Sequence, residues 1–77
     1  MIVKLQLKGP LKKYGREADT FKMQIESREI SVSDLLDLLS IPTSSVSFIL
    51  VDGEKAGLDA VLKGGETVIV NPRIAGG

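Results

Sequence analysis

The 77-residue chain contains no cysteine, no histidine and no tryptophan. The lack of cysteine excludes disulfides and thiol nucleophiles, and the lack of histidine removes the commonest general base and the usual zinc ligands. Carboxylates remain, but Asp34 and Asp37 have the spacing of a solvated helix face, where charged residues are normally found. The sequence therefore predicts no self-contained active site and no metal site, and it leaves open whether the chain is part of an enzyme.

Long apolar runs are also missing. No stretch could span a bilayer, and the alternating start at residues 1–5 does not have the shape of a signal peptide, so we expect a cytoplasmic protein with no membrane partner. Aromatic residues make up 4% of the chain, and the net charge is zero. Five basic residues precede the first acid, Glu17, whereas acids dominate the middle of the chain. That middle would repel a nucleic acid, so a protein partner of complementary charge is the better interpretation.

The first third of the chain has the pattern of two strands. Hydrophobic residues make up 43% of the chain, which suits one small domain with one core. Residues 2–8 and 20–26 alternate between apolar and polar side chains, as half-buried strands do. Gly9 and Pro10 interrupt the first run, and a polar loop extends through Gly15. We therefore expect an N-terminal hairpin with a long connection.

The hydrophobic period then changes to that of a helix. Four apolar residues share one face: Val32, Leu35, Leu36 and Leu39. Either Ser31 or Ser33 can cap the start by accepting a backbone N–H hydrogen bond, and Pro42 is expected to end the helix. The leucine face is assigned to the core, because a sheet in so small a chain has no other cover.

Further strands are predicted in the second half. Residues 46–51 form an apolar run, typical of a strand in the interior of a sheet. Asp52-Gly53 marks a tight turn into a short strand. Residues 58–62 predict a short helical turn or a loop, and Gly64-Gly65 turns the chain into a last strand at residues 66–70.

The order of these elements predicts an α+β protein with the β-grasp fold. We expect a mixed sheet of about four to five strands over one main helix, with the first and last strands as central parallel neighbours. Pro72 cannot donate to a ladder, so pairing is expected to end there. Residues 1–72 would then form the domain and residues 73–77 a flexible tail.

The tail carries the most informative feature of the sequence. Gly76 and Gly77 follow the last predicted strand, although glycine loses more conformational entropy on ordering than any other residue and has no side chain to bury. Without Cβ atoms, two glycines can pass along a narrow channel. The pattern favours a tail that delivers its carboxylate to another protein.

Four segments are typical of a known family. They are Ser33-Asp34-Leu35-Leu36, Phe48-Ile49-Leu50-Val51-Asp52-Gly53, Leu62-Lys63-Gly64-Gly65-Glu66-Thr67-Val68 and Pro72-Arg73-Ile74-Ala75-Gly76-Gly77. Over its whole length the chain resembles the ubiquitin-like sulfur carriers, most closely the small subunit of molybdopterin synthase. Arg73 stands where the molybdopterin branch more usually has valine or proline, and in this respect the tail is similar to that of ubiquitin.

The resemblance implies a function for the tail. A ubiquitin-activating-type enzyme would use ATP and magnesium to adenylate Gly77, and a sulfur donor would convert the adenylate to a thiocarboxylate. The partner would bind Gly76, Ala75, Ile74 and Arg73, while the chain itself holds no cofactor. A larger synthase subunit would receive the sulfur for molybdopterin (molybdenum or tungsten cofactor) biosynthesis.

Other functions share the same activation step. The chain could be a ubiquitin-like modifier joined to lysines of target proteins, or a sulfur carrier for thiamine synthesis or tRNA thiolation. A further alternative is a non-catalytic β-grasp interaction module whose glycines have no chemical role.

Overall fold

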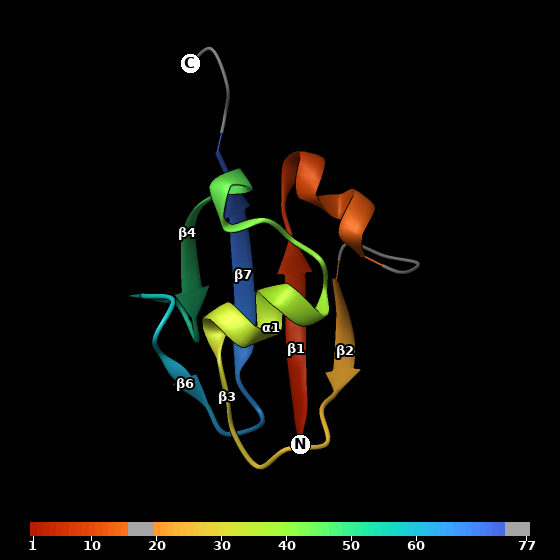
Figure 1. Cartoon of the computed structure of the whole chain (residues 1–77), viewed down its shortest axis with the longest axis vertical. Helices are drawn as coiled ribbons and strands as arrows, with labels where there is room; N and C mark the ends of the chain where they lie inside the picture. Colours follow the sequence, from red (N-terminus) through yellow and green to blue (C-terminus); the bar gives the residue numbers. More distant parts are fainter. Residues whose placement is uncertain (16–19, 74–77) are drawn as a thin grey trace.

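The computed structural model describes residues 1–15 and 20–73. In these residues five strands form one mixed sheet, in the order β2-β1-β7-β4-β5, and one α-helix crosses one of its faces (Figure 1). The elements are β1 (Ile2–Leu7), η1 (Gly9–Tyr14), β2 (Thr20–Gln24), β3 (Ile30–Ser31), α1 (Val32–Leu38), η2 (Thr43–Ser45), β4 (Val46–Val51), β5 (Glu54–Ala56), β6 (Val61–Leu62) and β7 (Thr67–Pro72). The predicted β-grasp fold is confirmed.

The first and last strands are parallel neighbours in the middle of the sheet, as predicted. Leu5 pairs with Val68 and Leu7 with Val70, and all four side chains are fully buried. Because side chains alternate along a strand, the residues between them face the opposite side of the sheet. The core therefore lies between the sheet and α1, and the other face of the sheet is not covered by the helix (Figure 1).

Helix α1 begins where its cap was expected. The Ser31 hydroxyl accepts a hydrogen bond from the Asp34 N–H at 3.0 Å, so Ser31 rather than Ser33 is the N-cap. Its predicted apolar face is buried. No described helix is long and apolar enough to cross a membrane.

The helix ends earlier than predicted, at Leu38, and Pro42 is not the cause. Ser40 adopts a left-handed conformation with φ of 60°, and its N–H donates to the Asp37 carbonyl at 3.0 Å. The Ile41 N–H donates to the Leu36 carbonyl at 2.9 Å. This pair of bonds is the Schellman motif, which satisfies carbonyls left free at a helix end.

Two other expectations are corrected. Residues 58–62 are only in part the expected turn or loop: the Ala60 N–H donates to the Gly57 carbonyl at 3.1 Å in a turn, but the last two residues form β6, which pairs antiparallel with β3, with Leu62 opposite Ile30. The connection after β1 is not a simple polar loop, since η1 buries Leu11 in the core. Both features depend on contacts with distant parts of the chain.

The turn before β7 is closed by a side chain. The Glu66 carboxylate accepts backbone N–H hydrogen bonds from Lys63 and Gly64, both at 2.7 Å. The adjacent Asp52 exchanges two bonds with Thr67: its N–H donates to the Thr67 carbonyl, and its Oδ1 accepts the Thr67 N–H, both at 2.9 Å. These contacts fix the start of the strand that leads to the tail.

Candidate functional site

The end of β7 is held at a defined place between η1 and η2. Strand pairing ends at Pro72, as expected, and the chain is held one residue further because the Arg73 N–H donates to the Ser45 carbonyl at 2.9 Å. Successive N–H groups point to opposite sides of a strand, so the Pro72 nitrogen faces away from β4. On that side the neighbouring strand, β1, has already ended at Leu7. The Pro72 ring lies so close to Gly9 that a Cβ there would be 3.2 Å from Pro72 Cγ.

Of the predicted site residues, the structure describes only Arg73, which is exposed. Ile74, Ala75, Gly76 and Gly77 lie outside the described residues, so their roles stay predictions. Arg73 follows β7 at the end of the molecule where η1 and η2 lie (Figure 1).

The face of the sheet opposite α1 carries an apolar patch. Phe48 is 40% exposed, and Leu50 and Ile69 are half-buried and directly opposite each other in the β4–β7 register. We call these three residues the open-face patch. The Lys55 ammonium lies 5.2 Å from the centre of the Phe48 ring, a cation–π arrangement at the border of the patch.

A β-bulge determines which residues form the patch. The β4–β7 register shifts between Val46 and Phe48, so the alternation along β4 is broken at Ser47. Consequently Val46 and Ile49 are buried while Phe48 is exposed. The expected interior position of β4 between two strands is confirmed, but its apolar run does not reflect burial on both faces.

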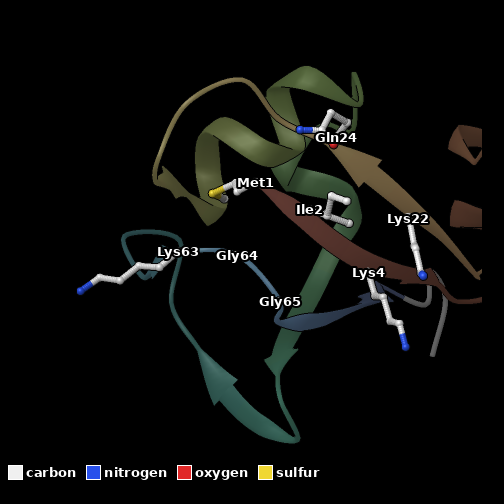
Figure 2. A pocket seen from close by; sticks show the side chains of 8 residues that line it. All are labelled: Met1, Ile2, Lys4, Lys22, Gln24, Lys63, Gly64 and Gly65. Carbon is white, nitrogen blue, oxygen red and sulfur yellow. The ribbon is translucent and has the colours of Figure 1, made fainter.

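A shallow hollow of about 640 Å³ lies at the other end of the same sheet, far from Arg73 along β7. The residues that line it, shown in Figure 2, are Met1, Ile2, Lys4, Lys22, Gln24, Lys63, Gly64 and Gly65. Lys4 and Lys22 are direct cross-strand partners and extend to the same side, whereas Lys63 points away from them (Figure 2). Like charges directly opposite each other are destabilising, so this pair does not stabilise the β1–β2 pairing.

One polar group beside the open-face patch has no partner among the described residues. The Asn71 Nδ2 atom is buried without a hydrogen bond, directly opposite Phe48 in the register. A buried donor left unsatisfied usually costs about 1–3 kcal/mol.

The described residues contain no group of three or more acidic side chains that could hold a metal ion. This surface combines an apolar patch, a bordering cation and a strand that leads to Arg73. Sequence reasoning placed Phe48 and Leu50 in an apolar run without assigning their face, and it missed Ile69 and Asn71.

Comparison with known proteins identifies the family. The sequence profile described as Mut7-C ubiquitin matches residues 2–76. The chain belongs to the Mut7-C ubiquitin family. Its predicted membership among ubiquitin-like proteins is thereby confirmed. No curated protein matches the chain.

Solved structures similar to this Mut7-C ubiquitin family member have the same fold. SAMP1 from Haloferax volcanii superimposes with a TM-score of 0.72 at 20% identity, covering 100% of both chains. A putative molybdopterin converting factor subunit 1 from Pyrococcus furiosus gives 0.73 at 20% identity, covering 96% of this chain and 99% of that one. A complex of subunits 1 and 2 of the molybdopterin-converting factor from Helicobacter pylori gives 0.62 at 19% identity, with 100% of both chains covered.

Proposed function

We propose that this chain is a sulfur carrier whose Gly77 carboxylate is adenylated and then converted to a thiocarboxylate, for sulfur transfer in molybdopterin biosynthesis. The observation that carries the proposal is a ubiquitin-like domain whose central strand leads directly into Arg73-Ile74-Ala75-Gly76-Gly77. The chain contributes the reacting carboxylate and the docking surface. We propose the cytoplasm as the place of the reaction.

Activation is needed because a carboxylate is a poor electrophile. A nucleophile that attacks it must place further negative charge on a group that is already anionic. In the proposed reaction a carboxylate oxygen of Gly77 attacks the α-phosphorus of ATP, which releases pyrophosphate and leaves a neutral acyl group bearing AMP. Hydrosulfide released by the donor then attacks the carbonyl carbon, AMP leaves, and loss of the sulfur-bound proton gives the thiocarboxylate. ATP and Mg²⁺ belong to the activating enzyme.

Each tail residue has a role in the proposal. Gly76 leaves room for the nucleotide, because a side chain at this position would clash with the wall of a narrow channel. The small side chain of Ala75 keeps the segment narrow. Ile74 and Arg73 contact the walls and the rim of the channel. The bond from the Arg73 N–H to Ser45 supports this assignment, because it fixes the direction in which the tail begins.

The open-face patch is the proposed docking surface for the activating enzyme and for a larger synthase subunit. Exposed apolar groups on a small soluble domain commonly mark interaction sites. The similar H. pylori protein was solved as a complex of subunits 1 and 2, which supports a larger partner for this chain as well.

The test is the intact mass of the protein after incubation with an activating enzyme, ATP, Mg²⁺ and a sulfur donor. We expect a gain equal to the replacement of one oxygen by sulfur, mapped to Gly77. A variant that lacks Gly76 and Gly77 serves as the control and should not change in mass. If the two proteins behave alike with several activating enzymes, the tail has no chemical role and the chain is an interaction module.

A second candidate is a ubiquitin-like modifier, favoured by the similarity to SAMP1 and by the ubiquitin-like Arg73. In this reaction a lysine amine of the target displaces AMP from Gly77 and forms an isopeptide bond. Trypsin cleaves after Arg73, so a conjugated lysine would retain residues 74–77 as an Ile-Ala-Gly-Gly remnant. Peptides that carry this remnant would establish conjugation, whereas transfer of sulfur to thiamine precursors or tRNA would identify another carrier branch.

A further inference from the structure

Two hollows flank the start of the tail. The first, of about 240 Å³, lies between η1 and η2 and is lined by Pro10, Leu11, Lys13, Tyr14, Ser44, Ser45, Pro72 and Arg73. The second, of about 510 Å³, lies along the first half of β4, which extends beyond its partner β5. Its lining includes Ser44, Phe48, Lys55, Leu58 and Arg73. Arg73 and Ser44 border both hollows.

The charged side chains among the described residues that line the two hollows are all basic. Lys13, Lys55 and Arg73 are exposed, and no carboxylate is among the described residues that line either hollow. Hydroxyl groups, including those of Ser44 and Ser45, accompany these cations. We call the three cations with the two serines the exit collar.

We infer that the exit collar binds an acidic protein surface around the entrance through which the partner receives the tail. This inference rests on the proposed function, which requires another protein to hold Gly77. The four residues after Arg73 span at most about 14 Å even when fully extended. Any enzyme that binds Gly77 therefore places its own surface close to the exit collar.

A protein surface fits this site better than a small anion does. Phe48 is 40% and Leu58 43% exposed in the wall of the larger hollow, and proline and leucine side chains line the smaller one. Arginine and aromatic residues amid apolar contacts are typical of protein interfaces. Arg73 adds a planar fork of donors that matches a carboxylate, and the like-charged collar disfavours partners without acidic groups.

The first experiment requires no activating enzyme. The amide resonances of the ¹⁵N-labelled protein are followed during titration with hexaglutamate, a probe for acidic protein surfaces. We expect shifts at Ser44, Ser45 and their neighbours that decrease with added salt. Shifts centred on Lys4 and Lys22 would overturn the inference, as would equal shifts with inorganic phosphate, which would indicate a small-anion site.

A matched pair of variants tests whether position matters or only net charge. Lys13→Glu/Arg73→Glu removes two collar cations, and Arg28→Glu/Lys63→Glu makes the same charge change elsewhere. All four side chains are exposed, so both variants should fold, as thermal unfolding would verify. We expect only the collar variant to lose the hexaglutamate shifts. Equal loss in both variants would mean unspecific attraction and would overturn the inference.

The second experiment measures thiocarboxylation kinetics with the activating enzyme. For Lys13→Glu/Arg73→Glu we expect KM to rise about tenfold at low salt with kcat unchanged, because surface ion pairs affect binding more than chemistry. The Arg28→Glu/Lys63→Glu control should retain the native KM. An unchanged KM in the collar variant would refute the inference and leave the proposed function standing. If the native protein is never thiocarboxylated, the proposed function fails, and the peptide titration still decides the role of the collar.

Discussion

Replacing Ser40 with glycine should stabilise the domain. Ser40 has φ of 60° at the end of α1, and this left-handed conformation costs an L-residue about 1–2 kcal/mol. Glycine adopts it freely, but glycine also gains about 0.5–1 kcal/mol of chain entropy in the unfolded state. The Ser40 side chain is exposed and its hydroxyl makes no hydrogen bond to any described residue, so little else changes. We therefore expect Ser40→Gly to raise the free energy of unfolding by about 0.5–1 kcal/mol.

The same substitution at Ser33 is a matched control. Ser33 is the second residue of α1, where glycine should lower the free energy of unfolding by about 0.5–1 kcal/mol. Urea unfolding followed by circular dichroism resolves both effects, because the free energy of unfolding of a domain of this size falls by about 1 kcal/mol per molar urea. In thermal unfolding, a change of about 1 kcal/mol shifts the Tm by about 4–8 °C. If Ser40→Gly and Ser33→Gly destabilise equally, Ser40 is not left-handed in solution and the account of the helix end is wrong.

Three further predictions concern the tail and the strand that leads to it. Gly76→Ala should leave thermal unfolding unchanged and slow thiocarboxylation by about tenfold or more, because a methyl group misplaces the carboxylate; a lower Tm would instead indicate a structural tail. Glu66→Ala should lower the free energy of unfolding by about 1–2 kcal/mol in urea, because two backbone N–H groups lose a charged acceptor, whereas Glu29→Ala should have little effect. Asn71→Thr should raise stability by up to about 1 kcal/mol, because it removes an unpartnered buried amide and introduces a β-branched residue; a loss would show that the amide finds a partner in solution.

The elements that sequence reasoning predicted correctly are those with a sustained period. Alternation at residues 2–8 identified β1 and its buried side, and the apolar spacing from Val32 to Leu39 identified the covered face of α1. Short or irregular elements lack this information. Leu62 belongs to a two-residue strand that exists only because Ile30 lies beside it, and Leu11 sits in a turn of η1 with no repeating pattern.

The open-face patch was harder to predict for a physical reason. The run from Val46 to Val51 is almost entirely apolar, so its pattern of residue types does not distinguish the two faces of the strand. The bulge at Ser47 then shifts the alternation and exposes Phe48. The hollows beside Arg73 join segments that are distant in sequence, and only the folded topology brings them together.

The parallel pairing of β1 with β7 affects how the protein is made. Leu5 pairs with Val68, which lies far along the chain, so the central ladder cannot form until β7 has been synthesised. Non-local pairing of this kind slows folding and leaves apolar strands exposed in the meantime. A nascent chain that stalls before β7 lacks the central strand of the sheet, so we expect chaperones to bind it or proteases to degrade it. Only a chain that has completed β7 can form the central ladder, so the fold itself selects against chains that end before this strand.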